Sequence, residues 1–157
     1  MARPIRRVVA GQDAGGRAVV TVDGPATNIA TSEHPAGRTV EPPSNGVDFR
    51  IAEFPPEDAG AIAALDGARA FAETGAAHRV VRGARHPMMH RTDTVDCAIV
   101  LEGEIDMPLD EQDVHLATGD VVIRRGTKHA WSNRYDRLCR IAFILIDAVD
   151  EYGRKRP

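Results

Sequence analysis

The sequence predicts an all-β protein, an antiparallel sandwich or barrel with an N-terminal hairpin and one short accessory helix. From residue 90 onward, short β-rich segments follow one another, separated by turn-forming residues and without any helical pattern between them. The last of them is continuously apolar from Ile141 to Ile146, which is typical of a strand buried on both faces. Closely spaced strands of this kind indicate an antiparallel fold. The predicted strands are 90–102, 104–109, 113–117, 120–124, 128–133 and 138–147.

Composition limits what the chain does. Its 157 residues suit one domain, and 43% apolar with 27% charged residues is the mix of a soluble globular protein. A net charge of -3 provides no basic field for nucleic acid, and no apolar run approaches the roughly 18 residues of a membrane span. The two cysteines belong to no C-x-x-C pair, which favours a reducing compartment. We therefore expect a cytoplasmic protein that binds neither nucleic acid nor membrane.

Residues 1–54 are predicted to form an arm. Two β-rich runs, 5–10 and 17–22, flank a turn-forming cluster and predict a hairpin. A loop rich in Pro, Gly, Ser, Thr and Ala covers 24–45, and alternation of apolar and polar residues over 47–54 predicts a half-buried strand. An arm of strands that cannot bury itself alone suits exchange with a second subunit, so we expect a homodimer.

Residues 55–89 are predicted to be a helix and a connector. Apolar residues at helical spacing within 57–75, with Gly75 placed as a C-terminal cap, predict the helix, although Gly60 and Gly67 weaken it. The basic segment 76–88 is expected to be a solvated loop. Residues 90–147 then form the barrel core, and the polar tail 148–157 is expected to fray.

The segment 90–102 carries the first group of candidate functional residues. Side chains of a strand alternate between its two faces, and one face here holds a histidine, two hydroxyls and a carboxylate before it becomes apolar. A packed core rarely contains such a row, whereas a ligand-binding interior suits it. The residues are His90, Thr92, Thr94 and Asp96.

A second polar stretch, 119–133, complements the first. His129, Trp131 and Asn133 share one face of a predicted strand. Trp131 is expected to wall a small-molecule pocket, or else to be core. Arg124 and Arg125 precede them and suit a carboxylate-bearing ligand, with a solvated pair at a strand end as the alternative.

Together the two stretches resemble the two sequence motifs of the cupin superfamily, small antiparallel jelly-roll barrels that hold a metal or a ligand in the barrel mouth. In the first motif, His90 falls on the first histidine, Thr92 on the second, Asp96 on the glutamate and Gly103 on the closing glycine. In the second motif, the glycines, the histidine and the asparagine are matched by Gly119, Gly126, His129 and Asn133.

Three departures from the family pattern bear on a metal. Thr92 replaces a histidine ligand, Asp96 has a shorter arm than glutamate, and Arg124 stands near the family's proline. One alternative is that His90, Asp96 and His129 hold a divalent metal such as Fe, Mn, Ni or Zn, with positions left open on the ion. The other is that the same three residues work without metal, a histidine acting as acid or base and Asp96 orienting an imidazole.

The expected function is an enzyme that converts a small organic molecule inside the barrel. His90, Asp96 and His129 are the predicted catalytic residues, and Thr92, Thr94, Trp131 and Arg125 are predicted to contact the substrate. Proton transfer of the lyase or isomerase type, such as dehydration, is the leading reaction class. The alternatives are a non-haem iron-dependent oxygenase and a non-catalytic metabolite-binding protein.

Overall fold

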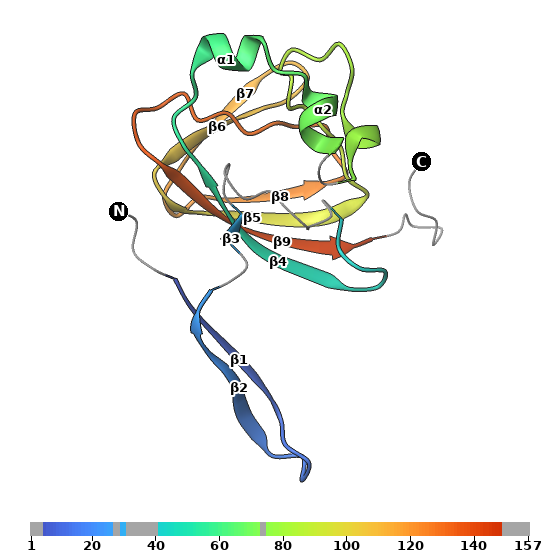
Figure 1. The fold of residues 1–157 in the computed structure, drawn as a ribbon, viewed down its shortest axis with the longest axis vertical. Helices are drawn as coiled ribbons and strands as arrows, with labels where there is room; N and C mark the ends of the chain where they lie inside the picture. Colours follow the sequence, from blue (N-terminus) through green and yellow to red (C-terminus); the bar gives the residue numbers. More distant parts are fainter. Residues whose placement is uncertain (1–4, 27–28, 31–40, 73–74, 149–157) are drawn as a thin grey trace.

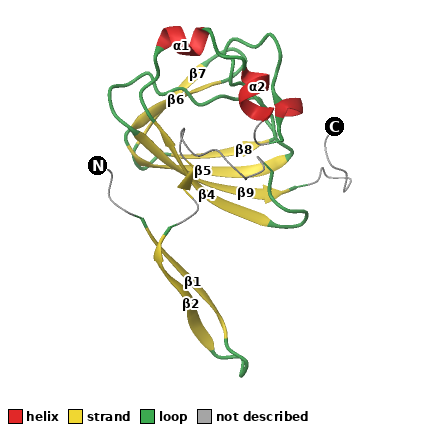
Figure 2. Cartoon of the chain, in the orientation of Figure 1, coloured by secondary structure: helices red, strands yellow, loops and turns green. Residues whose placement is uncertain are grey.

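The computed structural model describes residues 5–26, 29–30, 41–72 and 75–148. Its largest unit is a five-stranded sheet with the strand order β3-β4-β9-β5-β8, mixed only at the edge, where β3 runs parallel to β4 (Figures 1 and 2). These strands are β3 (Ile29–Ala30), β4 (Val47–Phe54), β5 (Thr94–Glu102), β8 (Val121–Arg125) and β9 (Cys139–Asp147).

A small second sheet faces the first across the core. Strands β6 (Glu104–Pro108) and β7 (Asp113–Ala117) form an antiparallel pair. The buried core takes side chains from both sheets, among them Val100 and Phe143 from the large sheet and Ile105 and Leu116 from the small one. The predicted all-β architecture is confirmed.

The inner face of the large sheet follows from strand alternation. Along β5, Thr94, Asp96, Ala98 and Val100 are buried while the residues between them are partly exposed, as predicted. The observed strand begins four residues later than the predicted strand 90–102, because regular pairing starts only at Thr94. The predicted strand 128–133 is replaced by two isolated bridges, which pair His129 with His90 and Ser132 with Asp106.

The outer face of the same sheet carries a row of apolar side chains. The register places Phe49, Ile144, Cys97 and Ile123 in one row across β4, β9, β5 and β8. Phe49 is 46% exposed and Ile123 is 67% exposed. Contiguous apolar surface of this kind is uncommon on a monomer.

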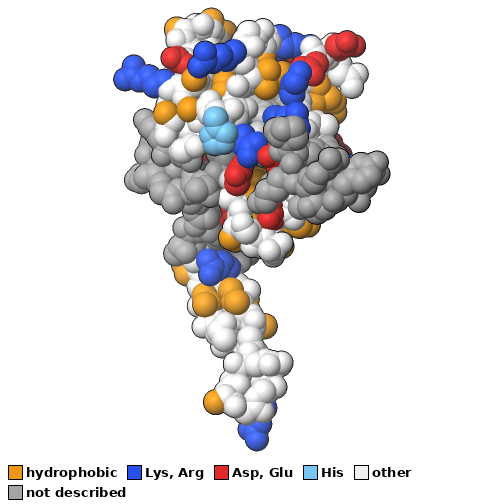
Figure 3. Space-filling model, turned by 90° about the vertical axis from the view of Figure 1, so that its right-hand side faces the viewer, with side chains coloured by type: hydrophobic (Ala, Val, Ile, Leu, Met, Phe, Trp, Pro, Cys, Tyr) orange, Lys and Arg blue, Asp and Glu red, His pale blue; other side chains and the backbone are white. Residues whose placement is uncertain are grey.

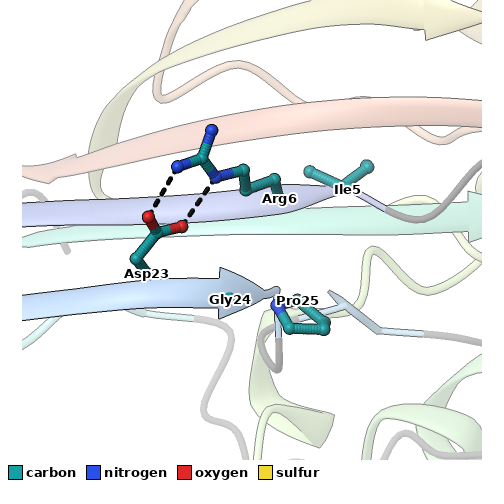
Figure 4. A pocket seen from close by; sticks show the side chains of 5 residues that line it. All are labelled: Ile5, Arg6, Asp23, Gly24 and Pro25. Atoms are coloured by element: carbon teal, nitrogen blue, oxygen red, sulfur yellow. Dashed lines mark hydrogen bonds and ion pairs between the residues drawn. The ribbon is translucent and has the colours of Figure 1, made fainter.

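The predicted hairpin is present as an arm, β1 (Arg6–Gln12) and β2 (Ala18–Pro25), which projects away from the barrel (Figure 1). Hydrophobic side chains are exposed along it (Figure 3), including Val8 and Val20. Near the arm's base, Arg6 donates two hydrogen bonds to the Asp23 carboxylate beside a shallow pocket of about 270 Å³ (Figure 4). Both charged side chains are well exposed, so this ion pair contributes little stability.

The single predicted helix is wrong, because the segment forms two short helices, α1 (Ala59–Ala63) and α2 (Gly67–Ala72). The Asp58 carboxylate caps α1 by accepting from the Ala61 N–H. At Gly67 an added Cβ would lie 1.9 Å from the Pro87 carbonyl oxygen, so α2 must start with glycine to pack against that segment. A 3-10 turn, η1 (Ala77–Arg79), follows within the predicted connector.

Two predictions fall partly outside the described residues. Within the predicted loop 24–45, residues 27–28 and 31–40 lie outside them, as does most of the predicted tail, residues 149–157. Among the helices that the structure describes, none has the length and apolar character needed to cross a lipid bilayer.

Candidate functional site

Polar side chains gather at the inner face of β5, where the strand begins. Thr92, Thr94 and Asp96 are all buried. The Thr92 and Thr94 hydroxyl oxygens are 2.7 Å apart, and Thr92 donates a long hydrogen bond of 3.4 Å to Oδ2 of Asp96. Since Thr92 has one hydroxyl proton, Thr94 is the donor in the pair. The carboxylate therefore ends a short chain of hydroxyls, and its Oδ1 is buried without a hydrogen-bond partner.

A guanidinium group lies opposite this carboxylate. Arg124 on β8 is the cross-strand partner of Asp96, which places Nη2 of Arg124 3.3 Å from Oδ2 of Asp96. Its Nη1 donates to Nε2 of His129. The rings of Trp131 and Phe143 lie 5.2 and 5.6 Å from the guanidinium carbon, a cation–π geometry that keeps the buried charge against aromatic faces.

The two histidines of the site lie side by side with defined tautomers. Nδ1 of His90 is 3.0 Å from the Met88 carbonyl oxygen, and Nδ1 of His129 is 2.9 Å from that of Thr127. A carbonyl only accepts, so each Nδ1 carries the proton and each Nε2 a lone pair. The ring centroids are 4.4 Å apart, and Phe71 of α2 packs on His90 at 4.8 Å.

Burial keeps both imidazoles neutral. It lowers the pKa of His90 to about 4, the Met88 carbonyl opposing this shift and the Arg124 charge adding to it. Burial also holds the pKa of His129 well below its usual range, with further lowering from Arg124 and His90. Burial lowers the pKa of Arg124, and the negative charge of Asp96 raises it in part. The site thus combines the Arg124 guanidinium with two imidazoles that burial keeps neutral.

Most of the predicted site residues come together. His90, Thr92, Thr94, Asp96, His129 and Trp131 form one cluster, with Trp131 packed edge-on to His129 at 6.0 Å. Arg125 is a correction, because it is exposed on the outer face of β8 while Arg124 is buried on the inner face. Which of the two arginines points inward depends on the register of β8 against β5, and the spacing of the motifs does not specify that register.

The predicted metal-ligand set is not assembled. Among the residues that the structure describes, no group of three His, Cys, Asp or Glu side chains is placed to hold a metal ion. Arg124 contacts both His129 and Asp96, and it donates to the Nε2 lone pair that an ion would need. A guanidinium at that point repels a divalent cation, and the Thr92 hydroxyl is a weak substitute for an imidazole. The residues present therefore do not fit Fe, Mn, Ni or Zn at His90, Asp96 and His129.

Two motif residues, Asn133 and Gly103, have structural roles. The Asn133 amide donates to the carbonyls of Phe54 and Arg137, both at 2.7 Å, and its oxygen accepts from the Tyr135 N–H. It thereby fixes the turn before β9. Gly103 has φ +77°, and an added Cβ would lie 2.5 Å from the Leu138 carbonyl oxygen.

The histidines of the two predicted sequence motifs lie together in a barrel of mostly antiparallel strands. Residues 78–146 match the Cupin_2 family, described as "Cupin domain", and this stretch of the chain is a cupin domain. It covers the site from His90 to Trp131 and excludes the arm.

Two fungal proteins are similar to part of the chain. Phomopsin biosynthesis cluster protein C' of Diaporthe leptostromiformis is 41% identical over 70 residues, and Oryzines biosynthesis cluster protein J of Aspergillus oryzae is 41% identical over 64 residues. The first match covers 43% of this chain and 37% of the fungal protein, and the second covers 40% and 36%. The chain thus spans little more than a third of these relatives.

A solved structure is also similar. The RmlC-like cupin family protein of Methanocaldococcus jannaschii has 13% sequence identity and a TM-score of 0.44, with 69% of this chain and 76% of that chain covered.

Proposed function

We propose that this chain is an enzyme that converts a small organic molecule at the His90 cluster by proton transfer of the lyase or isomerase type, such as dehydration. The observation that best supports this is the state of His90. Its Nδ1–H is held by the Met88 carbonyl, and its Nε2 has no hydrogen-bond partner among the described residues. A neutral imidazole with one available lone pair can accept a proton from a substrate and return it.

In a dehydration, Nε2 of His90 takes a proton from a carbon next to an electron-withdrawing group. The electron pair of that C–H bond forms the C=C bond while the neighbouring C–O bond breaks. The departing hydroxide takes the proton back from the imidazolium, so one water leaves and His90 returns to its starting state. The Arg124 guanidinium stabilises the negative charge that develops on the substrate.

The groups around His90 would position the substrate. His129 is a positioning residue, because its Nε2 accepts from Arg124 and so is not available to substrate. The Thr92 and Thr94 hydroxyl oxygens keep lone pairs that can accept a hydrogen bond from a substrate hydroxyl, and Trp131 provides an apolar wall. The fungal relatives are named as biosynthesis cluster proteins, which supports a biosynthetic role over a purely structural one.

The test is turnover of small hydroxy acids and keto acids in D₂O, followed by proton NMR. We expect loss of a C–H signal or appearance of an alkene signal with wild-type protein and with His78→Gln, since His78 is exposed in η1 and outside the cluster. His90→Gln should lower the rate by about 100-fold or more, the usual contribution of a general base. Unchanged turnover in His90→Gln removes His90 from the mechanism, and compounds that bind without reacting would indicate a binding protein instead.

A further inference from the structure

The buried guanidinium of Arg124 has more donors than partners. Arg124 is 5% exposed, and a guanidinium carries five N–H groups. Its contacts are the hydrogen bond to His129 and the 3.3 Å ion pair with Asp96, while its Nε is buried without a hydrogen-bond partner. Buried donors are satisfied in the great majority of cases. An incompletely satisfied guanidinium inside a barrel therefore points to a missing acceptor.

The group is also held in place before any ligand arrives. The Trp131 and Phe143 rings flank it, and β8 fixes its backbone opposite Asp96. Less side-chain freedom is then lost on binding, which favours affinity. Asp96 satisfies one edge of the guanidinium only in part, because its Oδ1 makes no hydrogen bond.

The chemistry of the missing acceptor follows from the fork of donors. Two oxygens in one plane accept two parallel N–H groups of arginine, and a charged acceptor strengthens both bonds. A carboxylate meets both requirements, whereas a hydroxyl or a single carbonyl meets neither. One added negative charge is also tolerable here, since both histidines are neutral and Asp96 and Arg124 balance each other.

We propose that Arg124 binds the carboxylate of a small organic acid and so serves as the fixed cation of this barrel. The inference rests on the proposed function for the presence of a substrate at the cluster, and it adds the substrate's class. The bound carboxylate would hold the adjacent carbon toward the free Nε2 of His90, which is next to His129.

Trp131 gives a direct readout, because it is the only tryptophan in the chain and contacts Arg124. We would titrate the protein with sodium acetate and with acetamide, its uncharged isostere, at constant ionic strength, and follow Trp131 emission. We expect a saturable change with acetate. The apparent affinity for acetamide should be lower by at least about tenfold, because a charge-assisted bidentate pair is replaced by weaker bonds.

Two variants sharpen the test. Arg124→Gln should abolish the acetate response, whereas Arg125→Gln, on the outer face of the same strand, should leave it unchanged. If Arg124→Gln fails to fold, Arg124→Lys keeps the charge without the fork, and we expect it to lower acetate affinity by about tenfold.

Equal responses to acetate and acetamide, or an acetate response that survives Arg124→Gln, would overturn the inference, as would the absence of any saturable change in the wild type. Its failure is distinguishable from failure of the proposed function. His90→Gln should still bind acetate, so acetate binding without turnover of any acid would remove only the enzyme. Turnover of uncharged compounds without acetate binding would remove only the role of Arg124.

Discussion

Asp96→Asn tests the energetics of the buried ion pair at the centre of the site. At 3.3 Å and an effective dielectric constant of about 20, the attraction between the two charges is about 5 kcal/mol. Both side chains are almost fully buried, so removal of one charge leaves the other without an opposite charge and without water. We expect Asp96→Asn and Arg124→Met each to lower the free energy of unfolding by about 3–5 kcal/mol.

The double variant provides the control. With both charges absent, no unpaired ion remains, and we expect a total loss of about 1 kcal/mol or a small gain. Urea unfolding of the wild type, the two single variants and the double variant, followed by circular dichroism at pH 7, gives the coupling free energy directly. Single losses below about 1 kcal/mol, or losses that simply add in the double variant, would refute the reasoning that this pair is buried and mutually dependent.

Three further predictions concern pH, packing and assembly. Because the pKa of His90 is about 4 in the folded state and 6.5 when unfolded, the unfolded state binds the proton first, and stability should fall by up to roughly 3 kcal/mol from pH 7 to pH 4. Urea midpoints across that range check this, and a His90→Gln variant with an equally steep profile would contradict it. Gly67→Ala should destabilise by about 2 kcal/mol or more despite alanine's higher helix propensity, because its Cβ meets the Pro87 carbonyl. Gly24→Ala, which meets nothing within 4 Å, is the matched control for melting measurements. We also propose a homodimer through the arm and the apolar row on the outer sheet face. Light scattering should give twice the chain mass, and Ile123→Lys should shift the mass toward that of one chain. A wild-type mass of one chain would reject the dimer.

The sequence allowed the strands and the face of β5 to be predicted because both depend on local pattern. Turn residues such as Gly119 and Gly126, which have positive φ, mark where strands end. Alternation alone placed Thr94 and Asp96 inside. These two rules are why Thr94 and Asp96 were expected on one inner face, where the structure places them.

The remaining features depend on contacts between distant segments. Only the pairing of β8 with β5 decides that Arg124, and not Arg125, faces the interior beside Asp96. The requirement for glycine at the start of α2 follows from the approach of Gly67 to Pro87, twenty residues away, a tertiary contact that a helical pattern does not encode. The metal alternative was left open by the sequence because the motif identifies which side chains are present, whereas the hydrogen bond of Arg124 to the Nε2 lone pair of His129 is a tertiary contact.

Phe71 connects the His90 cluster to the short helix α2. The ring that packs on His90 belongs to α2, a helix of six residues, and helices this short have little stability of their own. Elements of low local stability open more often than the sheet beneath them. Local opening of α2 would therefore uncover the His90 ring while the barrel itself remains intact.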